Sequence, residues 1–171
     1  MVLLLDNGRA PFVTSSTQEN LDYYENFLGA SVNQLIGDMF VVGAGYGFSH
    51  ADLQDDLPGV PTKVLSSARQ DVQADLQVLN GYIRFNHPSG FFALADVYWY
   101  HQNNYGYTPA LTGDSFVQLN LYAGYYFARH RAQLTLGLLN VTDQDYRLNP
   151  LTYYAELPRK LTFTLGLNFV F

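Results

Sequence analysis

Apolar and polar residues alternate strictly over the last twelve positions of this chain. The odd positions are all apolar: Leu161, Phe163, Leu165, Leu167, Phe169 and Phe171. The even positions are mostly small or polar, from Lys160 to Val170. Alternation with a period of two is typical of a β-strand, and about 9 to 11 such residues cross a bilayer with lipid on one side. We therefore expect residues 160–171 to form a membrane-spanning strand.

The same alternation predicts six further strands, over residues 24–35, 40–49, 72–85, 91–101, 117–127 and 133–141. The third of these changes phase, because Leu76 and Val78 favour one face whereas Leu79 and Ile83 favour the other. A β-bulge near Asn80 and Gly81 would reconcile the two halves. Part of an eighth strand is expected within residues 2–15. The pattern thus predicts an all-β chain of seven to eight antiparallel strands in up-and-down order.

The lengths of the connections indicate how these strands are oriented. Short links at 37–38, 87–90 and 129–131 alternate with long links at 54–69, 103–114 and 142–160. Bacterial outer-membrane barrels have short periplasmic turns and longer extracellular loops. Residue 171 falls on the side of the short turns, so we expect it to be periplasmic.

Alternation also assigns side chains to the two faces of the predicted sheet. The residues expected to face the lumen of a barrel are polar: Asp96, Gln118, Asn120, Tyr122 and Gln133. Gly43, Gly45 and Gly47 lie on the same face, which implies little room beside them. Aromatic residues gather at the ends of the apolar stripes, as in the girdles of membrane barrels: Phe40, Phe91, Phe92, Phe127, Phe169 and Phe171 near the short turns, with Tyr46, Phe48, Trp99 and Tyr100 toward the long loops.

Composition narrows the class of protein further. Hydrophobic residues make up 48% of the 171 residues and charged residues only 14%, and no apolar run is long enough for a transmembrane helix. A β-sandwich would also alternate, but its strands average about 5 to 6 residues. The net charge of −6, with no cluster of Lys or Arg, argues against nucleic acid as a partner. The absence of cysteine fits export to an oxidising compartment, although residues 1–6 do not form a secretory signal.

No group of residues in the sequence predicts catalysis, so we expect neither an enzyme nor a cofactor. Ser49, His50 and Asp52 are not spaced as a hydrolase triad. A cation site at His50, Asp52, Asp55 and Asp56 is a weaker interpretation than a solvated acidic loop, and no metal is expected. Four tyrosines of the long loops are candidates for stacking on a ligand, the alternative being that they pack the loops together: Tyr105, Tyr107, Tyr153 and Tyr154.

The C-terminal part of the chain resembles TonB-dependent outer-membrane receptors. Residues 138–150 read LLNVTDQDYRLNP, similar to the family's penultimate strand ending N-(L/V)-(F/T)-D-x-x-Y before the last extracellular loop. Asn140, Asp143 and Tyr146 carry this motif. Tyr154, Pro158 and Arg159 match the segment that opens the last strand, and Lys160 departs from the usual Gly or Arg. The terminal Phe171 resembles the signal by which the barrel insertion machinery recognises its substrates.

The resemblance implies a role in uptake across the outer membrane of a Gram-negative bacterium. Such receptors are large barrels filled by a plug, and they import siderophores, cobalamin or glycans using energy delivered by TonB. We expect residues 1–171 to be one domain, the C-terminal part of such a barrel, without a plug. Its partners would be the lipid bilayer and the remaining strands and plug of the parent receptor, with TonB reached only through that absent plug.

Two other interpretations remain open. One is a self-contained barrel of eight strands with a structural or adhesive role, whose eighth strand comes from residues 2–15. A weaker one is an outer-membrane enzyme on a small barrel, which would need an acid, base or nucleophile cluster at the long-loop side. A complete barrel must pair its first and last strands, whereas a fragment leaves two edges unpaired.

Overall fold

The protein is all-β with almost no helix. The computed structural model describes residues 2–3, 12–13, 16–127, 131–154 and 156–169. Seven strands form one antiparallel sheet in chain order: β3 (Asn20–Ile36), β4 (Phe40–Asp56), β5 (Arg69–Asn86), β6 (Phe91–Tyr105), β7 (Asp114–Phe127), β8 (Ala132–Leu139) and β9 (Thr162–Phe169). A 3-10 turn, η1 (Ser66–Ala68), precedes β5.

The sheet is not closed. Its edges are β3 and β9, which do not pair with each other. The described parts of residues 2–15 are β1 (Val2–Leu3) and β2 (Phe12–Val13), which pair with each other rather than with either edge. Residues 2–15 therefore add no eighth strand to the sheet in the described part of the chain. Among the described residues, none of the helical structure is long and apolar enough to cross a membrane.

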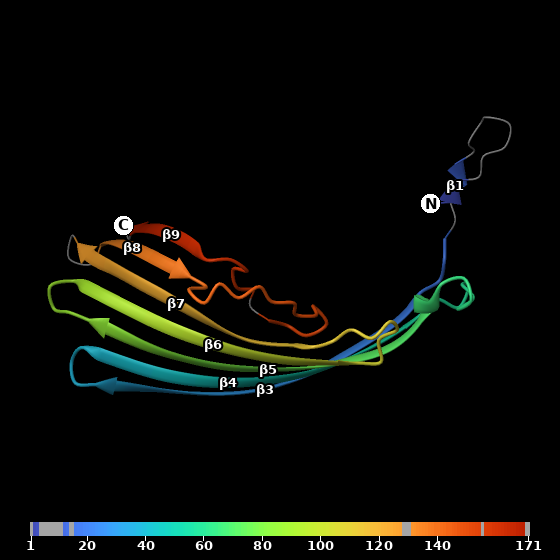
Figure 1. Cartoon of the computed structure of the whole chain (residues 1–171), viewed down its shortest axis with the longest axis horizontal. Coiled ribbons are helices and arrows are strands. Elements are labelled where there is room, and N and C mark those ends of the chain that lie inside the picture. Colours follow the sequence, from blue (N-terminus) through green and yellow to red (C-terminus); the bar gives the residue numbers. More distant parts are fainter. Residues whose placement is uncertain (1, 4–11, 14–15, 128–130, 155, 170–171) are drawn as a thin grey trace.

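Strands β3 to β6 run along most of the length of a curved sheet, whereas β8 and β9 are short and lie toward one end of it (Figure 1). Strand ends joined by short connections gather at one end of the sheet, together with the end of β9; the β4–β5 and β6–β7 connections lie at the other end, and the long β8–β9 segment lies over the sheet between them (Figure 1). The predicted alternation of short and long connections is confirmed. The sheet is concave on the side where the segment between β8 and β9 lies (Figure 1).

Several strands are longer or shorter than alternation alone predicts. Strand β4 continues to Asp56 and β6 to Tyr105, because their outer halves keep pairing after the apolar stripe has ended. Strand β8 stops at Leu139, one residue before Asn140, whose φ of 52° is incompatible with a strand. Phe171 lies outside the described residues.

The predicted bulge at Asn80 and Gly81 is wrong. Strand β5 pairs with β4 and with β6 in continuous register through both residues. The apolar positions change face for another reason: Leu79 and Ile83 lie exposed on the convex face, whereas Val72 and Leu76 are buried on the concave face. Leu76 is buried in an apolar core that Tyr146 and Leu148 of the β8–β9 segment form with the concave face.

The glycines of β4 allow neighbouring side chains to lie close to the sheet. A Cβ at Gly43 would come within 2.3 Å of both Asn33 Oδ1 and the Tyr82 ring, and one at Gly45 within 2.5 Å of Asn80 Oδ1. The predicted lack of room is therefore confirmed at these two positions, and it results from side chains that lean over the glycines from β3 and β5.

Phe92 and Tyr100 do not belong to girdles on the convex face. Both are buried, 3% and 2% exposed respectively. Phe92 packs against Tyr126, with ring centroids 4.9 Å apart, and carries the Arg84 guanidinium over its ring. Their even positions in β6 place them on the concave face, where they fill space between side chains of that face.

Candidate functional site: the segment that covers the concave face

Residues 140–161, between β8 and β9, form a segment that we call the cover loop. It turns back over the concave face (Figure 1), and hydrogen bonds join it to β3 at the opposite edge of the sheet. The Tyr23 hydroxyl of β3 donates to the Leu151 carbonyl, 2.8 Å away, across 128 positions of sequence. The cover loop thus ties together strands that are otherwise connected only through their neighbours.

Asn140 is the hydrogen-bonding centre at the start of the cover loop. Its side chain is fully buried. Its Nδ2 donates to the carbonyls of Gln144 (3.0 Å) and Pro158 (2.9 Å), and its Oδ1 accepts from the Gln144 amide at 2.9 Å. Its own backbone N–H donates to Asn120 Oδ1 at 2.8 Å. Asparagine tolerates the left-handed conformation that this position requires, so one residue satisfies both the turn and the polar groups around it.

Asp143 fixes the two ends of the cover loop to each other. Its amide donates to the Asn140 carbonyl at 2.9 Å, closing a tight turn, and its Oδ1 accepts from the Leu161 amide at 3.1 Å. Leu161 directly precedes β9. Two of the motif residues, Asn140 and Asp143, therefore act on the backbone of the chain itself.

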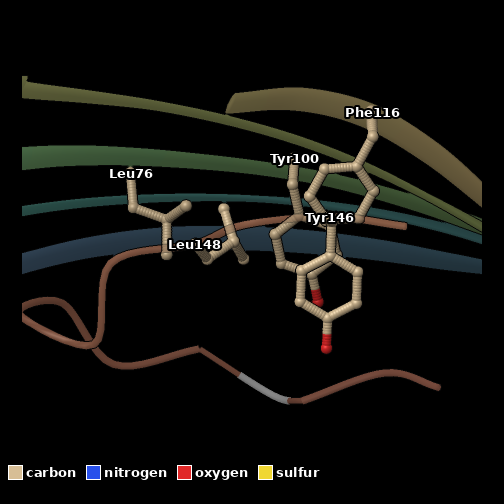
Figure 2. Close-up of a cluster of buried hydrophobic side chains, with 5 residues drawn as sticks. All are labelled: Leu76, Tyr100, Phe116, Tyr146 and Leu148. Carbon is tan, nitrogen blue, oxygen red and sulfur yellow. The ribbon is translucent and has the colours of Figure 1, made fainter. Parts of the chain in front are cut away.

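Tyr146 anchors the middle of the cover loop in an apolar core. The core consists of Leu76, Tyr100, Phe116, Tyr146 and Leu148, and Figure 2 shows Tyr146 and Leu148 reaching from the cover loop to the sheet. The Tyr146 ring stacks on Phe116, with centroids 4.7 Å apart, and Phe116 stacks on Tyr100 at 5.2 Å. The Tyr146 hydroxyl donates to the Leu157 carbonyl at 2.5 Å, and Arg159 lies over the same ring.

Gln102 of β6 holds the next part of the cover loop. Its side chain is 1% exposed, its Oε1 accepts from the Asn149 amide at 2.5 Å, and its Nε2 donates to the Asn149 carbonyl and the Thr152 hydroxyl. A buried amide can be accommodated here because both of its ends are satisfied.

Glu25 of β3 binds the tip of the cover loop. Its carboxylate accepts hydrogen bonds from the Ser49 hydroxyl, from the Tyr23 hydroxyl at 2.6 Å and from the Tyr153 amide at 3.2 Å. Desolvation raises the pKa of Glu25, but these three donors outweigh it and the pKa lies below its ordinary value. Desolvation and the adjacent carboxylate raise the pKa of Tyr23 to about 12, so its hydroxyl remains a donor at neutral pH.

We predict that the tip of the cover loop loosens in acid. Because the pKa of Glu25 is lowered in the folded state, its contribution to stability is complete above the ordinary carboxyl pKa of 4.5 and is lost as pH falls below that value. A spin label at Tyr153→Cys, in a chain that has no other cysteine, should become more mobile below pH 4.5.

The matched control carries Glu25→Gln in addition to the label. Its amide cannot titrate, so the label's mobility should no longer change over this pH range. An equal response with and without Glu25→Gln would contradict the assignment of the transition to this carboxyl group.

The five residues predicted to face a lumen share the concave face. Gln118 and Asn120 are buried beneath the cover loop: Gln118 donates to the Pro158 carbonyl at 3.1 Å, and Asn120 donates to Asp96 at 2.7 Å. Tyr122 is half-buried, and Gln133 donates to Thr135 on its own strand. Three of the five thus belong to a polar network that supports the cover loop.

The structure does not bring the four loop tyrosines together. The Tyr107 hydroxyl accepts a hydrogen bond from Asn149 Nδ2, and Tyr154 packs against the apolar core. Tyr105, at the end of β6, and Tyr153, at the tip of the cover loop, are exposed. Tyr153 instead lines a groove with residues of β3 to β6, and of the four tyrosines it alone lines that groove.

The acidic outer ends of β4 and β5 are occupied by pairwise contacts. His50 pairs with Asp75 at 2.6 Å, Asp52 accepts from Gln73, and Asp56 accepts from Arg69. Among the described residues, no group of three metal-ligating side chains is placed to hold an ion. Ser49 lies on the concave face and His50, one residue later in the strand, on the other face, so these two cannot form a nucleophile and base pair.

Sequence reasoning did not identify Glu25, Gln102 or Asn149 as site residues. Glu25 and Gln102 occupy positions on the concave face beyond the predicted apolar stripes. One signal in the sequence could have identified Glu25 and Gln102: each is a polar residue that continues the alternation of its strand beyond the apolar part.

We compared the chain with known protein families, curated proteins and solved structures. No protein family, curated protein or solved structure matches the chain.

Proposed function

We propose that this chain is a segment of the wall of a transmembrane β-barrel, belonging to an outer-membrane transport receptor of the TonB-dependent kind. The observation that carries the proposal is a continuous exposed apolar face. Six strands present large aliphatic or aromatic side chains there: Leu28 and Val32, Leu79 and Ile83, Val97, Val117 and Leu121, Leu134, Leu136 and Leu138, and Phe163, Leu165 and Leu167. An apolar surface of this extent is rare on a protein surrounded by water.

Aromatic residues and strand geometry support a membrane as the partner of this face. In β4, Phe40 and Tyr46 are exposed near the two ends of the apolar stripe. The stripe from Phe40 to Phe48 extends about 26 Å along the strand, or roughly 20 Å when the strand is tilted. Beyond it, the convex positions of β4 are polar, including His50, Asp52 and Gln54. The apolar stripe is therefore bounded, as a surface that meets a bilayer should be.

The open edges favour a larger barrel over a self-contained one. Seven strands form the sheet, whereas single-chain bacterial barrels have an even number of strands, and open edges do not occur in the hydrocarbon region. Completion by further strands of a parent receptor meets both requirements. The alternative, an eight-stranded barrel with a structural or adhesive role, would need the described parts of residues 2–15 to leave their mutual pairing and join an edge.

The proposal of a receptor rests on the resemblance of residues 138–150 to TonB-dependent receptors. The contacts of the motif residues show what these residues do in the fold. Asn140, Asp143 and Tyr146 fold the last long loop back onto the sheet. An uptake role in the outer membrane of a Gram-negative bacterium, for siderophore-like or other small ligands, remains part of this proposal. The sequence of the open reading frame upstream of residue 1 tests this proposal. We expect it to encode a plug domain and further strands with alternating apolar residues, and their absence would favour the small barrel.

A labelling experiment tests the membrane face directly. Spin labels at Ile83→Cys, on the convex face, and at Tyr82→Cys, on the concave face, are compared after the full chain is placed in phosphatidylcholine vesicles. We expect the label at residue 83 to collide mainly with oxygen, which concentrates in lipid, and the label at residue 82 to collide mainly with a water-soluble nickel chelate.

Gln54→Cys provides the control for depth. It is exposed on the same face as the apolar stripe but lies beyond it, so its label should meet the nickel chelate. If the label at residue 83 were as accessible to the chelate as the label at residue 54, the convex face would not be in lipid and the proposal would fail.

A further inference from the structure

A groove of about 480 Å³ lies on the concave face beside the tip of the cover loop. It spans β3 to β6, with Gly29, Gly45 and Gly47 among the residues that line it. Its size falls in the range of small-molecule sites, which are mostly apolar with a few polar groups. The groove adjoins the apolar core that holds Tyr146, because Tyr100 belongs to that core and Val78 and Tyr98 pack against it.

Two aromatic rings in the groove are unusually exposed. Phe27 is 74% exposed and Tyr153 is 83% exposed, although both lie on the concave side of the sheet. The glycines explain how Phe27 is placed: a Cβ at Gly29 would come within 2.9 Å of its ring and one at Gly47 within 3.2 Å. Because these Cβ atoms are missing, the ring lies close to the sheet backbone and leaves most of its surface free.

Tyr153 is fixed by its backbone rather than by its ring. Its amide donates to Glu25, two residues before Phe27 in β3. The Glu25 carboxylate is in turn held by Ser49 and Tyr23. Glu25 is thus a positioning residue for Tyr153, and the exposed phenol ring is free to contact a molecule in the groove.

The chemistry of the lining selects a class of ligand. No charged side chain lines the groove, so an anionic ligand would lack the cationic partner that it needs. Ser31, Asn80 and Tyr98 contribute hydroxyl and amide groups, which a purely apolar ligand would leave without hydrogen bonds. Aromatic ring faces are electron-rich and attract the weakly positive C–H groups of a sugar ring.

We propose that this groove binds a neutral sugar ring between Phe27 and Tyr153. The ring would present its C–H face to an aromatic side chain and its hydroxyl groups to Asn80 and Ser31. This inference rests on the proposed function in one respect, because it needs the concave face to be open to water. It narrows the transported or captured ligand to a neutral carbohydrate.

The test uses the full chain in lauryldimethylamine oxide, a detergent without a sugar headgroup. Maltotriose is the neutral probe and sialyllactose the anionic one, and binding is followed by saturation-transfer NMR and by titration calorimetry. We expect maltotriose to bind with saturation transfer to its ring C–H protons. Tyr153→Ala and Phe27→Ala should each weaken binding about fivefold, since an aromatic contact contributes about 1 kcal/mol.

Tyr105→Ala is the matched control. Tyr105 is an exposed tyrosine at the end of β6 that does not line the groove, so its loss should leave maltotriose binding unchanged. The inference would be overturned by the absence of maltotriose binding, by tighter binding of sialyllactose, or by an equal loss of binding in all three variants. Since this experiment needs no bilayer, its outcome is independent of the labelling test of the membrane face.

Discussion

Replacing Asn140 with alanine is expected to lower the free energy of unfolding by about 3 kcal/mol. The substitution removes the donors to the Gln144 and Pro158 carbonyls and the acceptor for the Gln144 amide, at a position that is fully buried. A buried polar group that loses its partner costs about 1–3 kcal/mol. Alanine also adopts the left-handed conformation at residue 140 less readily than asparagine, by about 1 kcal/mol.

Urea unfolding followed by the fluorescence of the single tryptophan, Trp99, measures this effect. Asn140→Asp keeps the shape but turns a carboxylate oxygen, instead of the Nδ2 donor, toward the Gln144 and Pro158 carbonyls, so we expect it to lose at least as much stability as Asn140→Ala. Asn26→Ala removes an asparagine whose side chain is exposed and should change stability by less than about 0.5 kcal/mol. Equal stability of Asn140→Ala and Asn26→Ala would show that the cover loop does not depend on this residue.

Truncation of Tyr146 to alanine is expected to cost about 4 kcal/mol. The side chain is 1% exposed and stacks on Phe116 within the apolar core, and removal of a large buried aromatic side chain typically costs about 3–5 kcal/mol. The loss should appear first as detachment of the cover loop, because the strands keep their own hydrogen bonds. Limited proteolysis within residues 141–161, together with urea unfolding, measures both consequences.

Two variants separate packing from hydrogen bonding at this position. Tyr146→Phe keeps the ring but loses the bond to the Leu157 carbonyl, so we expect a loss of about 1 kcal/mol. Tyr153→Ala removes a ring that is 83% exposed on the same loop and should have little effect on stability. If Tyr146→Ala left the cover loop resistant to protease, the stacked core would not be what holds it.

Alternation predicted the strands well because each strand of a sheet places successive side chains on opposite faces. The seven strands, their order and the alternation of short and long connections follow from that period and from the turn residues between them. The prediction failed at Asn80 and Gly81, where a change of apolar phase was interpreted as a bulge. The register there is continuous, and the phase changes because a different surface of the same strand is covered.

The candidate site was only partly visible in the sequence. The motif residues Asn140, Asp143 and Tyr146 were identified by resemblance, but the resemblance did not indicate what they contact. Glu25 and Phe27 were not identified at all. The partner of Glu25 lies more than a hundred positions away, in the cover loop. Phe27 lies against a glycine of the neighbouring strand. Such contacts depend on where a long irregular segment lies, and irregular segments carry no periodicity.

The sequence by itself determined the all-β class, the strand order and the division of each strand into an apolar and a polar side, since these depend on local alternation and short turns. Only the tertiary structure decided that the cover loop crosses the concave face to β3, and that a groove lined by Phe27 and Tyr153 lies beside its tip. The physical reason is that hydrogen bonds and packing between distant segments depend on the curvature of the whole sheet, which no local pattern records.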